Sequence, residues 1–239
     1  MKKILITGAN QGIGFEAAKQ LAGLGHYVYL GSRSQSNGIE AQEKLHEAGF
    51  HNVECIELDV TDVKSIQSVK HILESKEHQL DVLINNAGIA GEQPQTMSTG
   101  NMANLRNVFE TNFFGAVQTT QLLMDLLKKS DAPRIINVSS PLGSLSIQTD
   151  SQSPNFRIYD AYSASKTALN AFTVLLSKEL QDTNFSVISV EPGYTASNLN
   201  GYQGTQTTAQ AAGIIVQFAT VHDVSTGTFF DRNGNKLAW

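Results

Sequence analysis

Short apolar runs that alternate with longer helical patterns constrain the fold of this chain more than any other feature of its sequence. Most of these runs are continuously apolar, which is typical of strands buried on both faces of a parallel sheet. Six have the length and composition of strands, and a seventh at 227–230 is weaker; the six lie at 3–6, 27–30, 53–58, 81–85, 134–139 and 185–190. Helical patterns follow them, at 15–24, 38–48, 62–74, 105–129, 162–180 and 208–220.

This order of elements predicts the fold class. Strand–helix–strand units form right-handed crossovers, which place helices on both faces of one sheet. We therefore predict an α/β fold with a single, doubly wound parallel sheet of about seven strands. The length of 239 residues suits one domain, so residues 1–239 are expected to form a single domain. Two irregular polar stretches stand out: 144–157 reads as a surface loop, and 193–208 is a candidate substrate loop.

Composition narrows the range of partners. The 22 acidic and 17 basic residues are interspersed, and no Lys/Arg-rich run suggests a nucleic-acid or lipid surface. A single cysteine, Cys55, excludes an internal disulfide and a cysteine-based metal cluster, and we expect no metal. No stretch approaches the ~20 apolar residues of a membrane span, and the first apolar run is too short for a signal peptide. We expect a cytoplasmic protein that acts on a small molecule.

The stretch TGANQGIG, residues 7–14, lies between the first strand and the first helix. Gly8 allows a tight exit from the strand, Gly12 lets the backbone approach a pyrophosphate, and Gly14 allows the helix to pack closely on the sheet. The free N–H groups at the helix start would then face the anion. The glycine spacing differs from G-x-G-x-x-G, so the general dinucleotide motif is only approximated, and an ordinary flexible turn is the alternative.

The end of the second strand predicts which dinucleotide binds. An acidic residue usually holds the NAD ribose there, whereas this chain has Ser32 followed by Arg33. A guanidinium binds a 2′-phosphate through bidentate, charge-assisted hydrogen bonds, while a carboxylate would repel it. The pattern favours NADP(H) over NAD; a solvated surface arginine is the alternative interpretation.

The stretch YSASK, residues 162–166, supplies a candidate catalytic pair. Tyr162 and Lys166 are four positions apart and share one helix face. A nearby ammonium favours the phenolate, so we expect Lys166 to lower the pKa of Tyr162 from its usual value of ~10. Taken alone, a pair with this spacing is more often a core tyrosine beside a solvated lysine. However, Ser139 and Ser140 end a strand at the sheet edge where ligands of open α/β sheets bind.

In order along the chain, these motifs resemble those of the short-chain dehydrogenase/reductase family. The matching residues are 7–14, Asp59 and Val60, 85–88, Asn112, Ser139 and Ser140, Tyr162 and Lys166, and Pro192 and Gly193. The resemblance covers essentially the whole chain and implies a Rossmann-type fold. ANQGIG in the first loop, GSR after the second strand and TNFFG around Asn112 look most like the NADPH-dependent carbonyl reductases.

The resemblance implies roles for particular residues. Tyr162 would donate a proton to a carbonyl oxygen, and Lys166 would lower its pKa and hold the nicotinamide ribose. Ser140 would hydrogen-bond the substrate oxygen, and the backbone of Asn112 would anchor a water in a proton relay. The expected cofactor-binding residues are Gly8, Asn10, Gln11, Gly12, Ile13, Gly14, Arg33, Asp59, Val60, Asn86, Ala87, Gly88, Tyr162, Lys166, Pro192, Gly193, Thr195 and Ser197. The expected substrate residues are Leu142, Tyr194, Leu199 and Tyr202.

Three features depart from the family pattern. Ser197 stands where threonine is usual, and Glu191 is an uncommon residue before the Pro-Gly turn. A carboxylate there either alters cofactor affinity or points away from the cofactor. Tyr162 follows Ser140 by 22 positions, a longer separation than in many members, and both a monomer and a homo-oligomer stay open.

We therefore expect an enzyme that reduces an aldehyde or ketone with NADPH. The same residues would serve an NADP-dependent alcohol dehydrogenase working oxidatively, and NADP preference tilts the expectation toward reduction. A non-catalytic dinucleotide sensor is the alternative from another class, although it would have no need of Tyr162, Lys166, Ser140 and Asn112 together. The apolar and aromatic residues expected around the substrate suggest a medium-sized, largely apolar carbonyl compound.

Overall fold

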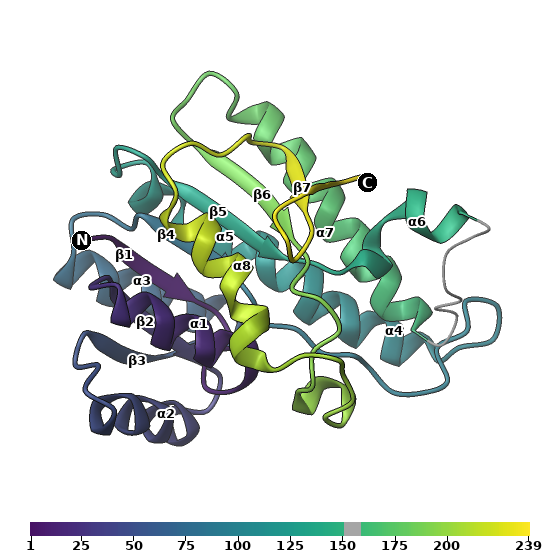
Figure 1. Ribbon diagram of the computed structural model, residues 1–239, viewed down its shortest axis with the longest axis horizontal. Coiled ribbons are helices and arrows are strands. Elements are labelled where there is room, and N and C mark those ends of the chain that lie inside the picture. The colour runs from purple at the N-terminus through teal and green to yellow at the C-terminus, as the bar shows by residue number, and fades with distance from the viewer. Residues whose placement is uncertain (151–158) are drawn as a thin grey trace.

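The computed structural model describes residues 1–150 and 159–239, and one eight-stranded sheet runs through this part of the chain (Figure 1). The strand order is β3-β2-β1-β4-β5-β6-β7-β8, with every neighbouring pair parallel except β7 and β8. The strands are β1 Lys3–Ile6, β2 Tyr27–Ser32, β3 Val53–Glu57, β4 Val82–Asn85, β5 Arg134–Val138, β6 Ser186–Val190, β7 Thr228–Phe230 and β8 Lys236–Leu237. The predicted α/β class is confirmed; the strand not foreseen is the two-residue β8.

Helices cover both faces of the sheet, as the strand–helix alternation predicts. They are α1 Gly12–Gly23, α2 Gln35–Glu47, α3 Val63–Lys76, α4 Met102–Phe109, α5 Gly115–Leu127, α6 Leu145–Thr149, α7 Asp160–Glu179 and α8 Thr208–Thr220. Successive strand side chains point to opposite faces. In β1, Ile4 and Ile6 pack in the core formed with α1, α2 and α8, whereas Leu5 packs in the core formed with α3, α5 and α7. Burial on both faces explains why the strands read as continuous apolar runs.

The predicted helix at 105–129 is interrupted in the structure. A π-helical turn, Glu110–Phe114, separates α4 from α5, and the N–H of Gly115 donates to the carbonyl of Glu110 five residues earlier. Asn112 lies in this turn and is buried. The wide turn lets its side chain reach the backbone of Ile89, to which it makes two hydrogen bonds of 2.8 and 3.0 Å. π-turns inside α-helices often occur at functional sites.

The predicted loop at 144–157 is wrong for its first part. A 3-10 turn, Pro141–Gly143, leads into α6, whose N-cap Ser144 accepts a hydrogen bond from the N–H of Ile147. Carbonyls at the C-terminal end of the chain hold this short helix: the Ser144 hydroxyl donates to Ala238 at 2.8 Å, and Ser146 donates to Trp239. These contacts are remote in sequence, which explains why local composition pointed to a loop. Residues 151–157 lie outside the described part.

The stretch 193–208 contains a second short turn. After Pro192, the backbone makes an isolated bridge between Thr195 and Gln206, and the 3-10 turn Asn198–Asn200 lies between them. α8 begins at Thr208 behind a capping box formed by Thr207 and Gln210. The bridge therefore brings the two ends of this stretch together. No described helix is long and apolar enough to cross a bilayer.

Candidate active site

A cleft of about 830 Å³ lies at the carboxyl ends of the central strands. Its lining residues follow β1, β2, β3, β4, β5 and β6 along the chain, together with the start of α7. In open α/β sheets, this edge is where ligands bind. The chain thus brings together residues that are more than 180 positions apart, such as Gly8 and Asn200.

Most of the residues expected at the site line this cleft. They are Gly8, Asn10, Gln11, Gly12, Ile13, Arg33, Asp59, Val60, Asn86, Ala87, Gly88, Ser140, Leu142, Tyr162, Lys166, Pro192, Gly193, Tyr194, Thr195, Ser197 and Leu199. Three expected residues do not line it: Gly14 and Asn112 are buried behind its walls, and Tyr202 is 72% exposed. Asn198 and Asn200, in the segment 198–202 that we expected to wall the substrate pocket, also line the cleft, and residues that the sequence did not single out are Leu58, Thr61, Ile89, Ala90, Gly91, Thr111, Val138, Pro141 and Tyr159.

The glycine turn at the start of α1 has the shape that a phosphate requires. Gly12 has φ +63°, and a Cβ at this position would meet nothing within 4 Å, so the backbone faces open space. Gly14 is crowded instead, because a Cβ there would lie 2.5 Å from Nδ2 of Asn86 and 2.8 Å from the carbonyl oxygen of Gly8. The two glycines therefore have different surroundings. Gly12 leaves room in the cleft, whereas Gly14 permits α1 to pack closely against the glycine turn and Asn86.

Thr7 opens the glycine motif, but the role of its side chain was not predicted. Its hydroxyl oxygen accepts hydrogen bonds from the backbone N–H groups of Asn86 at 3.0 Å and Ala87 at 2.9 Å. The Asn86 side chain in turn donates to the carbonyls of Thr7 and Gly8, at 2.9 and 3.0 Å. The segment after β4 is thus fastened to the glycine turn after β1. Only the position of Thr7 at a strand end, directly before Gly8, hinted at this.

Arg33 lies at the exposed rim of the cleft. Across residues 1–150 and 159–239, no carboxylate forms an ion pair with its guanidinium. Ser32, directly before it, is buried, and its hydroxyl donates to the carbonyl of Ser34 at 2.8 Å. The rim therefore offers a cation that pairs with no described carboxylate, and Ser32 rather than an acidic residue stands where a 2′-hydroxyl acceptor would be.

Tyr162 and Lys166 lie on the first turns of α7, facing the cleft. Nζ of Lys166 is 5.6 Å from the centre of the Tyr162 ring and donates to the carbonyl of Val138 at 2.7 Å. Close packing holds this helix against the segment after β5, since a Cβ on Gly143 would lie 2.7 Å from the Lys166 backbone. Ser140 lines the same part of the cleft and forms a hydrogen bond with the Tyr162 side chain.

Burial dominates the protonation of this pair. It raises the pKa of Tyr162 to about 12, and the hydrogen bond with Ser140 opposes that rise. Burial also lowers the pKa of Lys166 to about 8. The expectation that the ammonium brings the Tyr162 pKa down is therefore wrong for this structure. Burial disfavours the charged form of each group.

Glu191 turns its carboxylate toward the backbone beside the cleft. Its Oε2 accepts from the N–H of Gly193 at 2.8 Å, and its Oε1 accepts from the N–H of Arg232 at 3.1 Å. The residue is 7% exposed, and burial raises its pKa. Both oxygens are thus engaged in holding the Pro192–Gly193 turn to the segment after β7. This explains how a carboxylate is tolerated at the position.

Comparisons with known proteins agree with this geometry. The model of the short chain dehydrogenase family matches residues 2–208. A (+)-neomenthol dehydrogenase from Capsicum annuum is 30% identical over an alignment that covers 95% of each chain. The solved structure of an NADPH-bound carbonyl reductase from chicken fatty liver superposes with a TM-score of 0.86 at 25% identity, covering 100% of this chain and 99% of that one. The carbonyl reductase Sniffer of D. melanogaster has a TM-score of 0.86 at 28% identity, with 100% of both chains covered.

Proposed function

Because the chain belongs to the short-chain dehydrogenase family, and is an oxidoreductase of that family, we propose that it reduces an aldehyde or ketone to the alcohol with NADPH. One observation carries the proposal. One cleft joins the open glycine turn and the exposed Arg33 guanidinium at one end to Tyr162, Lys166 and Ser140 at the other. The first set suits a dinucleotide with a 2′-phosphate, and the second suits proton transfer to a carbonyl oxygen.

The residues present suit NADP(H). The backbone at Gly12 faces open space that a pyrophosphate would fill, and helix N-termini favour such anions. Arg33 would take the 2′-phosphate through charge-assisted hydrogen bonds. Asp59 and Val60 would contact the adenine, and Lys166 would hold the nicotinamide ribose. When bound, the nicotinamide supplies the hydride, while the protein supplies orientation and charge placement. The NADPH named in the chicken carbonyl reductase structure supports this choice.

Tyr162 acts as the proton donor in this scheme. With a pKa of about 12 its hydroxyl keeps its proton at neutral pH, so it is ready to donate to an oxygen that gains negative charge. Ser140, hydrogen-bonded to the Tyr162 side chain, holds the substrate oxygen beside it. Lys166 lies 5.6 Å from the ring centre and favours the phenolate that remains after transfer.

The direction of turnover is part of the proposal. The same groups can run an alcohol oxidation, and the relative from Capsicum annuum carries the name of a dehydrogenase. Reduction is favoured by the protonated state of Tyr162 and by the two carbonyl reductases that share the fold over the full chain. We further propose that the substrate is medium-sized and largely apolar, because Leu142, Tyr194 and Leu199 line its end of the cleft.

Replacement of Tyr162 by phenylalanine tests the proposal. Wild type should oxidise NADPH in the presence of members of a small carbonyl panel, with NADH assayed in parallel. Tyr162→Phe should lower kcat by about 10²–10⁴-fold, the usual contribution of a general acid. Binding of NADPH, followed by its fluorescence, should be largely unchanged. A Tyr162→Phe enzyme with wild-type turnover would disprove the assigned role.

A further inference from the structure

Three buried amide side chains hold the segment that follows β4, residues 89–92. Asn112 accepts from the N–H of Ile89 and donates to its carbonyl. Gln95 donates from Nε2 to the carbonyl of Ala90 at 2.6 Å. Asn104 accepts from the N–H of Glu92 at 2.9 Å and donates to its carbonyl at 2.8 Å. The segment has no regular secondary structure, and residues 89–91 form a wall of the cleft. Its shape is therefore set by side chains from elsewhere.

Gln95 makes a second contact that reaches the proposed proton donor. Its Oε1 accepts from the backbone N–H of Tyr162 at 3.1 Å, across 67 positions of sequence. The first N–H groups of a helix lack intrahelical partners, and Tyr162 is the third residue of α7. The N-cap of that helix, Tyr159, offers no side-chain cap. Gln95 thus supplies from a distant loop the acceptor that a local capping residue would normally provide.

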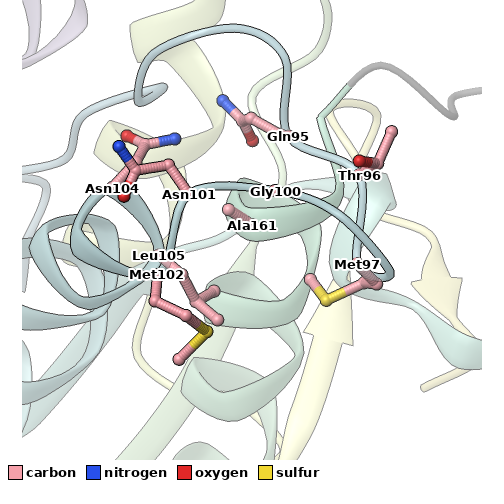
Figure 2. Close-up of a pocket in the computed structure, with 9 residues that line it drawn as sticks. All are labelled: Gln95, Thr96, Met97, Gly100, Asn101, Met102, Asn104, Leu105 and Ala161. Atoms are coloured by element: carbon pink, nitrogen blue, oxygen red, sulfur yellow. The ribbon is translucent and has the colours of Figure 1, made fainter.

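Gln95 itself has little freedom to move. It is 4% exposed, and the two polar atoms of its amide group are bonded to α7 and to the wall of the cleft. Figure 2 shows it beside a small cavity of about 20 Å³, which Asn104 and Ala161 also line. Such a volume holds about one water. Because one amide group bonds to both partners, it links the position of α7 to that of residues 89–91.

The other two amides provide an internal comparison. Asn112 also reaches α7, because it donates to the hydroxyl of Ser165 at 3.0 Å, and that hydroxyl donates to the carbonyl of Tyr162 at 2.7 Å. The hydrogen bonds of Asn104 within the described chain all go to Glu92. Asn104 therefore supports the same segment without a hydrogen bond to the catalytic helix.

We propose that Gln95 is a positioning residue, which fixes the start of α7 against residues 89–91 and thereby sets where the Tyr162 hydroxyl lies in the cleft. The proposal rests on the function proposed above, in which Tyr162 is the proton donor. Misplacement by about 1 Å can cost proton-transfer chemistry on the order of 10²-fold. Loss of the Gln95 bridge should therefore act on kcat more than on binding of either substrate.

Matched substitutions separate positioning from general support. Gln95→Met and Asn104→Leu each replace a buried amide by an apolar side chain of similar size. Gln95→Met should lower kcat about tenfold or more, with the KM values changed less than about threefold, since the lost contact acts on the reacting group. Hydrogen exchange at the Tyr162 amide should become faster in this variant. Asn104→Leu should lower the melting temperature comparably, yet keep kcat within about twofold and keep the Tyr162 amide protected.

A conservative variant completes the test. Gln95→Glu keeps an oxygen that can accept from the Tyr162 N–H, but an ionised carboxylate has no proton to donate to the carbonyl of Ala90. It should therefore keep the amide protection that Gln95→Met loses but recover little of the kcat, because only the half of the bridge that reaches α7 remains. Unchanged kcat in Gln95→Met, or equal kcat loss in Gln95→Met and Asn104→Leu, would overturn the proposal. If wild type reduced no carbonyl at all, the proposed function would fail instead, and amide exchange would still decide whether Gln95 holds Tyr162.

Discussion

Replacement of Gly14 by alanine should destabilise the fold far more than the same change two residues earlier. A Cβ at Gly14 would lie 2.5 Å from Nδ2 of Asn86, 2.8 Å from the Gly8 oxygen and 2.9 Å from Cα of Ala9. The Asn86 side chain could swing away, but the other two neighbours are backbone atoms. Relief therefore requires the glycine turn and α1 to move apart.

The magnitude follows from the contacts that would be lost. Moving Asn86 breaks its hydrogen bonds to the carbonyls of Thr7 and Gly8, at about 1 kcal/mol each. Overpacking against fixed backbone adds about 1–3 kcal/mol. We expect a loss of about 3–5 kcal/mol, which for a chain of this size lowers the melting temperature by about 10 °C.

Gly12→Ala is the matched control. Its Cβ would meet nothing within 4 Å, and only the positive φ of +63° is strained. That strain costs about 1 kcal/mol, or about 2–4 °C of melting temperature. The added methyl group would occupy the open space beside the turn, so we expect weaker NADPH binding from a well-folded protein. Thermal unfolding and NADPH titration of both variants provide the measurement. Equal melting temperatures for the two variants would refute the reasoning that Gly14 is needed for close packing and Gly12 for space that a ligand fills.

Two further predictions concern charge. Arg33→Asp should lower kcat/KM for NADPH at least about tenfold more than for NADH, because it replaces charge-assisted hydrogen bonds by repulsion; equal losses with both cofactors would contradict the role of Arg33. Since burial lowers the pKa of Lys166 from 10.5 to about 8, the folded chain releases this proton at lower pH than the unfolded chain does. Wild type should therefore gain stability relative to Lys166→Met as the pH rises from about 8 to 10.5, and a constant difference in urea midpoints across that range would count against it.

The elements that the sequence predicted well carry local signals. Continuous apolar runs marked the strands because both faces of the sheet are covered, and glycines marked the turn after β1 because each is needed there for backbone or packing reasons. Tyr162 and Lys166 could be paired because helical spacing places them on one face. Such signals depend on neighbours within a few residues, which a sequence displays directly.

The elements that the sequence missed depend on distant contacts. β8 has only two residues and exists through its pairing with β7, and α6 is held by the carbonyls of Ala238 and Trp239. The capping of Tyr162 by Gln95 spans 67 positions, so no local pattern reveals it. The protonation of Tyr162 was misjudged for a related reason: spacing shows that Lys166 is near, but only the packed structure shows how strongly burial acts.

The π-helical turn between α4 and α5 sets the relative rotation of two helices. α4 packs on α7, whereas α5 packs on α3 and the central strands. The buried face of this continuous helical segment therefore points in different directions before and after the π-helical turn. A residue advances an α-helix by about 100°. Deleting one residue within Glu110–Phe114 would restore regular winding, but it would rotate α4 by about that angle relative to α5. Val108, whose side chain lies beside Gly91, and Asn104, which bonds to Glu92, would then swing away from these two residues. The number of residues in this turn therefore fixes how α4 is rotated relative to α5. Insertions or deletions within the turn should be tolerated far less well than substitutions.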